Sequence, residues 1–158
     1  MSLSHFDSNG ESRMVNVGAK SPTHREAVAS AMIRMKPATL TLIQDKQIAK
    51  GDVFEVARLA GIMAAKRTDE LIPLCHSLGL EGVTVDFEIQ SDSTVQIKTR
   101  VQTFSKTGVE MEALVAATTA ALTLYDMCKS VDREIQIEQV QLEEKTGGKS
   151  GHFIRQSE

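Results

Sequence analysis

The sequence predicts an α+β protein in which helices cover one face of an antiparallel sheet. Two segments, 83–89 and 95–101, alternate between apolar and polar residues, and the Ser-Asp-Ser run at 91–93 between them is typical of a hairpin turn. A long stretch of small and apolar residues over 106–129 has the pattern of a helix. Strands and helices of this kind pack as two layers around a single core.

The N-terminal part of the chain is expected to contain a tail, a short strand and a helix. Residues 1–12 are polar and rich in serine, which predicts a disordered tail. Apolar residues within 14–17 predict a short strand. Pro22 predicts the start of a helix over 21–35, because proline fits the first helical position without the loss of a hydrogen bond.

Two more helices are expected before the hairpin. Residues 38–44 predict a short one. Asp52 predicts the start of the other, because its carboxylate can accept a backbone hydrogen bond in the first turn and Glu55 follows three residues later. Lys66 and Arg67 indicate where this helix ends, since cations suit a helix C-terminus.

A last strand completes the order of elements. The apolar residues of 135–142 predict it, and a one-residue shift in their phase indicates a β-bulge near 138–139. The order is then strand, helices, strand, strand, helix, strand, which is the ferredoxin-like β-α-β-β-α-β order with extra N-terminal helices. We expect one such domain over 13–153, with the second face of its sheet polar or covered by a partner.

The composition excludes several classes of protein. The chain has 158 residues and a formal net charge of -3, which does not favour a general nucleic-acid-binding protein. No apolar run is long enough for a membrane helix, and the N-terminus has no signal-peptide pattern. Cys75 and Cys128 lack zinc-ligand spacing, so no metal site is expected, and two reduced thiols suit the cytoplasm.

Asp126 and Lys129 are the first candidate for chemistry. They lie three residues apart near the end of the long helix and therefore face the same side. A surface ion pair of little energetic value explains this spacing equally simply. The apolar neighbours of the pair indicate partial burial, which would shift both pKa values and make an acid–base couple.

Three further segments carry candidate residues. His76, beside Cys75, is either a structural histidine or a proton carrier near neutral pH; a Cys–His nucleophile pair has no orienting third group. The Gly-Lys segment at 145–151 is either a solvated end of the chain or an anion-binding loop, and it lacks the first glycine of a phosphate-binding P-loop. Lys50 precedes a helix N-terminus, where anions are favoured. Together Lys50, Lys129, Lys145 and Lys149 supply positive charge that suits a phosphorylated small molecule.

The spacing along the long helix predicts an oligomer. Glu112 and Asp126 are fourteen residues apart on one flank, which places them about 21 Å apart along the axis. A small-molecule site does not extend over that distance. If both ends of the helix contribute to such sites, the two ends belong to different copies of the site. Residues of another subunit then complete each copy.

Six motifs in one order resemble the molybdenum cofactor biosynthesis protein C family, the cyclic pyranopterin monophosphate synthases. The resemblance runs from about Met14 to Phe153. The motifs are KGDV at 50–53, AAKRT at 64–68, LIPLCH at 71–76, KTGVEMEAL at 106–114, YDMCK at 125–129 and GGKSG at 147–151.

The resemblance implies a lyase that uses no cofactor. Its substrate would be 3′,8-cyclo-7,8-dihydroguanosine 5′-triphosphate, derived from GTP, and its products cyclic pyranopterin monophosphate and pyrophosphate. Members of the family are ferredoxin-like homohexamers, trimers of dimers, with active sites between subunits. An alternative from another class is an oligomeric nucleotide-binding or regulatory module without turnover.

The resemblance also assigns roles to individual residues. It implies that Asp126, Lys129 and Lys50 are catalytic. Its substrate-binding positions are Leu74, Cys75, His76, Met111, Glu112 and Lys145. Since active sites lie between subunits, we expect Lys50 and Lys129 of one site to come from different chains. Purine rearrangement requires proton donors and acceptors near the ring, and departure of pyrophosphate requires cations.

Overall fold

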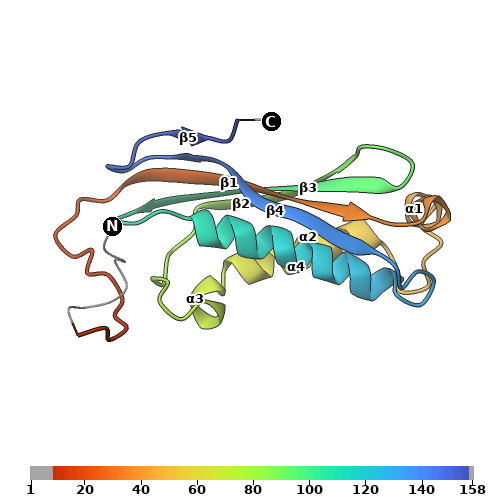
Figure 1. Ribbon diagram of the computed structural model, residues 1–158, viewed down its shortest axis with the longest axis horizontal. Helices are drawn as coiled ribbons and strands as arrows, with labels where there is room; N and C mark the ends of the chain where they lie inside the picture. Colours follow the sequence, from red (N-terminus) through yellow and green to blue (C-terminus); the bar gives the residue numbers. More distant parts are fainter. Residues whose placement is uncertain (1–8, 157–158) are drawn as a thin grey trace.

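The computed structural model describes residues 9–156 and shows one sheet with helices against one of its faces (Figure 1). The elements, in chain order, are β1 (Thr23–Arg34), α1 (Pro37–Gln44), α2 (Val53–Ala65), α3 (Thr68–Leu71), β2 (Gly82–Ile89), β3 (Thr94–Ser105), α4 (Glu110–Cys128), β4 (Gln136–Thr146) and β5 (Phe153–Ile154). The strands pair in the order β2-β3-β1-β4-β5, and every pair is antiparallel. The predicted α+β class is confirmed.

Helix α4 lies beneath the sheet and runs along most of its length, with α2 beside it (Figure 1). The contact surface of α4 is made of small side chains, because Ala113, Ala117, Ala120 and Ala121 are all fully buried. Larger core residues from the strands, such as Ile33 and Ile97, fill the space around them. None of the helices within residues 9–156 is both long and apolar enough to cross a membrane.

The helix expected over 21–35 is wrong, because this segment forms the central strand β1. Ala27, Ala29, Ala31 and Ile33 are fully buried, and they recur every second residue as a strand requires. Alanine favours helices in isolation, but small side chains here allow α4 to approach the sheet, and pairing with β3 and β4 satisfies the backbone. Tertiary packing has overridden local propensity.

The strand expected at 14–17 is also wrong, because these residues have no regular secondary structure. Val15 and Val17 instead line a pocket near the start of α4. The order β-α-β-β-α-β is nevertheless present, since β1 takes the first place in it. Of the disordered tail expected over 1–12, residues 1–8 lie outside the described part of the chain.

The other predicted elements are present, whereas the short helix α3 and the short strand β5 were not expected. Helix α1 occupies 37–44, and α2 begins where Asp52 Oδ1 accepts a hydrogen bond from the Glu55 N–H at 3.2 Å. The hairpin joins β2 to β3 across 90–93. The predicted bulge in β4 is confirmed, because its register with β1 shifts there and Gln139 adopts a φ of 48°.

Gly61 allows α2 and α4 to lie in close contact. A Cβ atom at this position would lie 3.0 Å from the Ala116 carbonyl oxygen and 3.1 Å from a methyl group of Val85. Both distances are shorter than ordinary van der Waals contact, and one neighbour is helix backbone. A larger residue therefore forces the two helices apart, and with them the residues that α2 and α4 carry.

We expect Gly61→Val to lower the free energy of unfolding by about 1–3 kcal/mol, because it overpacks this contact. Met63→Val is the matched control, since it places the same β-branched residue on an exposed side of α2. Chemical denaturation followed by circular dichroism measures both. A loss for Gly61→Val no larger than that for Met63→Val would contradict the close contact.

Candidate active site

The C-terminal end of α4 carries a cluster of three charged side chains. Lys129 donates a hydrogen bond to Asp126 Oδ1 at 2.5 Å. Lys50, from the loop between α1 and α2, donates to Asp126 Oδ2 at 3.2 Å and to the Asp126 carbonyl oxygen at 2.7 Å. All three predicted catalytic residues are thus brought together in one chain. One carboxylate thus binds both lysines within a single chain, whereas the sequence predicted that the two lysines of a site come from different chains.

The charges of this cluster stabilise one another. Hydrogen bonds from Lys129 and, to a smaller extent, from Lys50 hold the pKa of Asp126 below its usual range. The hydrogen bond between Lys129 and Asp126 also raises the pKa of Lys129. The side chains remain 43% exposed for Lys50, 56% for Asp126 and 52% for Lys129. The partial burial expected from the sequence is therefore absent, and pairing rather than desolvation shifts these pKa values. The cluster is a charged, accessible surface.

A pocket of about 400 Å³ lies at the other end of α4. Five of the predicted substrate-binding residues line it: Leu74, Cys75, His76, Met111 and Glu112. The first three come from the connection between α3 and β2, and the last two from the first turn of α4. Separate segments, about 35 residues apart in sequence, thus form one wall.

Glu112 gives this pocket a carboxyl group whose pKa is shifted by its surroundings. Its side chain is buried, with a relative exposure of 4%. Burial, and to a smaller extent the charges of Glu110 and Asp69, raise its pKa to about 7. A carboxyl group with this pKa can either donate or accept a proton near neutral pH, which is what general acid–base catalysis requires.

His76 and Cys75 differ in what they offer. His76 Nε2 lies 2.7 Å from the Val15 carbonyl oxygen. Because a carbonyl oxygen only accepts, Nε2 is the donor, and Nδ1 is the nitrogen able to take up a proton. Burial, followed by the charges of Glu112 and Asp69, raises the pKa of the Cys75 thiol. A thiol held neutral does not favour the Cys–His nucleophile.

A second, basic pocket of about 810 Å³ adjoins the first. Lys20, Thr107, Gly108 and Glu110 line both, so the two pockets share one wall. The basic residues of the larger pocket are Lys20, Arg25, Lys106 and Lys149. Four cations beside the N-terminus of a 19-residue helix provide a favourable site for anions.

The Gly-Lys loop belongs to this basic pocket. Gly148 has a φ of 76°, and a Cβ atom there would lie 2.1 Å from a guanidinium nitrogen of Arg25. The missing side chain thus lets the loop lie against Arg25 and brings Lys149 to the pocket. Lys145 donates to Glu110 Oε1 at 2.7 Å, which places its ammonium group beside the junction of both pockets. Of the two interpretations of this segment, the structure favours the anion-binding loop.

The profile of the MoaC family matches residues 14–148, most of the chain. The chain belongs to the MoaC family. Among curated relatives, the cyclic pyranopterin monophosphate synthase of Heliobacterium modesticaldum is 57% identical over 98% of both chains. That of Desulfitobacterium hafniense is 53% identical over 99% of this chain and 96% of its own.

A third relative broadens the comparison. Cyclic pyranopterin monophosphate synthase 3 of Mycobacterium tuberculosis is 56% identical over 97% of this chain and 86% of its own length. All three relatives are more than half identical to this chain over nearly all of its length. The MoaC family assignment made from six short motifs is therefore confirmed.

Sequence reasoning missed part of the basic pocket of this MoaC family member. Lys20 lies in a segment expected to be a connection, with no pattern to distinguish it. Glu110 stood within a recognised motif, but its contacts with Lys145 and with both pockets depend on how β4 lies beside α4. Arg25 was expected on a helix. Because this segment is strand β1 instead, the guanidinium group of Arg25 lies beside Gly148 of the Gly-Lys loop.

We expect the buried carboxyl of Glu112 to make stability fall as pH rises. Its folded pKa of about 7 exceeds its ordinary value of 4.5, so the folded state binds the extra proton in this interval. Stability from protonation is complete below about pH 4.5 and is lost as pH rises through about 7. Between pH 5 and 8 this titration should lower the free energy of unfolding of the unsubstituted protein by roughly 3 kcal/mol. Glu112→Gln should abolish that decrease, because glutamine does not titrate.

Denaturant unfolding at both pH values measures the difference. Glu88→Gln is the control, because Glu88 is an exposed carboxylate on β2. The prediction is contradicted if the two variants show the same dependence on pH as the unsubstituted protein.

Proposed function

We propose that this protein is a cyclic pyranopterin monophosphate synthase of molybdenum cofactor biosynthesis. It converts 3′,8-cyclo-7,8-dihydroguanosine 5′-triphosphate to cyclic pyranopterin monophosphate and releases pyrophosphate. The family assignment supports the reaction, and the names of three relatives describe the same enzyme. The observation that carries the proposal is the adjoining pair of pockets, one lined by a carboxyl group with a pKa of about 7 and the other by cations.

The pockets suit the two halves of this substrate. The larger one offers Lys20, Arg25, Lys106 and Lys149 to a triphosphate, whose charge the helix N-terminus also stabilises. The smaller one offers Met111 and Leu74 for contact with a flat ring system and Glu112 for exchange of protons.

The reaction requires proton transfer and stabilisation of a leaving group. Ring rearrangement moves protons between nitrogen, carbon and oxygen atoms, for which Lys129, Asp126, His76 and Glu112 provide donors and acceptors. Closure of the cyclic phosphate forms a new P–O bond at the α-phosphorus and breaks the bond to the β-phosphate. Lys50 or Lys145 then stabilises the negative charge that develops on pyrophosphate.

We also propose that the sites are completed between subunits of a homohexamer, a trimer of dimers. Within one chain the two clusters lie at opposite ends of α4, about 21 Å apart along its axis. Exposed apolar side chains on the helical side, among them Leu59, Leu71 and Leu122, offer surface for contact with another subunit. The free thiols of Cys75 and Cys128 are in keeping with a cytoplasmic enzyme.

The direct test is to incubate the pure protein with the cyclic GTP derivative and to measure pyrophosphate and the pyranopterin. We expect product from the unsubstituted protein and a fall of at least about 100-fold in turnover for Lys129→Ala, with assembly unchanged. The alternative of a binding module without turnover predicts bound substrate and no product. Absence of product from authentic substrate would refute the proposed enzyme.

Mixing of inactive variants tests the shared site. Because Lys50, Asp126 and Lys129 lie in one cluster, the informative pair is Glu112→Ala with Lys129→Ala. If each site takes one cluster from each of two chains, random exchange should restore about a quarter of the activity. A mixture of Lys50→Ala with Lys129→Ala should restore none, since both changes damage the same cluster. No rescue by the first pair after demonstrated exchange would indicate a site within one chain.

A further inference from the structure

The loop that carries Lys50 has an unusual backbone at both ends. It runs from the end of α1 to the start of α2, and Lys46 and Gly51 adopt φ values of 54° and 107°. A left-handed conformation costs a residue such as lysine about 1–2 kcal/mol. The segment between them is fixed in the middle by Ile48, which is buried and accepts a hydrogen bond from the Gly51 N–H at 3.0 Å.

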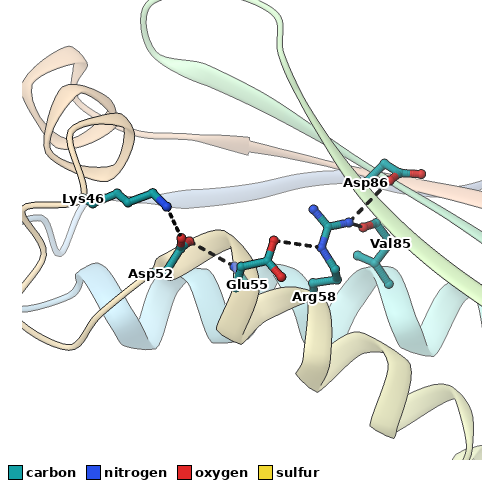
Figure 2. Close-up of polar contacts among 6 residues, drawn as sticks. All are labelled: Lys46, Asp52, Glu55, Arg58, Val85 and Asp86. Carbon is teal, nitrogen blue, oxygen red and sulfur yellow. Dashed lines mark hydrogen bonds and ion pairs between the residues drawn. The ribbon is translucent and has the colours of Figure 1, made fainter.

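Asp52 joins the two ends of this loop. Its Oδ2 atom lies 3.0 Å from the ammonium group of Lys46, and its Oδ1 atom accepts a hydrogen bond from the Glu55 N–H at 3.2 Å (Figure 2). The hydrogen bond from Lys46 and then that from the Glu55 backbone hold the pKa of Asp52 below its ordinary value. One carboxylate thereby ties the strained start of the loop to the first turn of α2.

The position of the Lys50 ammonium group depends on the backbone at the two ends of this loop. Its ammonium group must reach Asp126 on α4, an element 76 residues away in sequence, at 2.7 Å from the carbonyl oxygen and 3.2 Å from the carboxylate. A lysine side chain is long and flexible. Because the side chain itself adds little rigidity, the backbone position of Lys50 decides how often its ammonium group occupies this place.

We propose that Asp52 is a positioning residue for Lys50. Its ion pair with Lys46 and its bond to α2 keep the loop closed, so that the Lys50 ammonium group stays at Asp126. The inference rests on the proposed function, in which Lys50 is catalytic. An exposed ion pair contributes little to stability, so loss of the Lys46 contact should affect turnover much more than unfolding.

The neighbouring polar contacts provide a matched control. Glu55 Oε1 accepts a hydrogen bond from Arg58 at 3.2 Å, and Arg58 continues to the Val85 carbonyl oxygen and to Asp86 on β2 (Figure 2). This part of the chain of contacts joins α2 to the sheet, and the hydrogen bonds of the Glu55 and Arg58 side chains described here lie within α2 or end on β2. Glu55→Gln therefore removes a charged pair of the same kind on the same helix while the Lys46–Asp52 pair remains.

The experiment compares kcat, KM and melting temperature in Asp52→Asn, Lys46→Ala and Glu55→Gln, with the authentic cyclic GTP derivative as substrate. Asparagine retains the cap of α2 but loses the ion pair. We expect kcat to fall about tenfold in the first two variants, a fraction of the ~100-fold that a 1 Å misplacement costs. KM and melting temperature should stay near those of Glu55→Gln, and Lys46→Arg should restore kcat.

A second readout does not require turnover. In the unsubstituted protein, an amine-acylating reagent should label Lys50 slowly, because its ammonium group is bound to Asp126, and Lys66 serves as the exposed reference. Mass spectrometry should show faster labelling of Lys50 relative to Lys66 in Asp52→Asn and Lys46→Ala.

The outcomes separate the two proposals. Unchanged kcat and unchanged labelling in both variants overturn the role of Asp52, whether or not the protein is the proposed enzyme. A fall in kcat that comes with a melting temperature well below that of Glu55→Gln, and without rescue by Lys46→Arg, also overturns the proposal. Asp52 would then act only as a helix cap. Absence of product from the unsubstituted protein, with the labelling change observed, refutes the function but retains the positioning contact.

Discussion

The contact between α4 and the central strand β1 is the constraint on which the rest of the structure depends. Both surfaces are built from alanine, with Ala27, Ala29 and Ala31 on the strand and the alanine stripe of α4 opposite, and all are fully buried. Thr99 fixes the approach, because its hydroxyl donates to the Ala113 carbonyl oxygen at 2.8 Å within this layer. Small side chains on both sides bring the helix axis close to the sheet, and a larger one would displace it along its whole length.

A helix held in this way separates the two groups of functional residues rigidly. Met111 and Glu112 stand at the start of α4, and Asp126 and Lys129 at its end, so neither group can approach the other by a local change. Each end gathers residues from a second segment: the connection after α3 at one end and the α1–α2 loop at the other (Figure 1). The architecture therefore places two groups of candidate residues in each chain, one at each end of α4, and the proposed assembly would combine them between chains as two half-sites.

Much of the site was predictable from the sequence, whereas part of the fold was not. Asp126 and Lys129 are three apart on one helix, so their contact follows from helical geometry alone. The pairing of Lys50 with them, and the convergence of Cys75, His76 and Glu112, required the motifs of the family, since they depend on long-range packing. The strand over 23–34 was mistaken for a helix because Pro22 indicated a helix start, and the continuous burial of residues 27–31 leaves no alternation that would have indicated a strand. Lys20 carried no signal, because its place is set by the loop that packs on the pocket.

The two half-sites differ in the physical origin of their charge, and the difference suits two kinds of proton chemistry. At the end of α4, Lys129 and Lys50 hold Asp126 ionised, so this exposed cluster keeps fixed charges across the neutral range. At the start of α4, burial moves the pKa of Glu112 to about 7, so the charge of that carboxyl changes with its surroundings. Any anion bound in the adjoining pocket would add negative charge and favour the protonated carboxyl further. Binding of an anion and protonation of Glu112 are therefore coupled, whereas the exposed carboxylate of Asp126 is held ionised by its hydrogen bonds to two lysines.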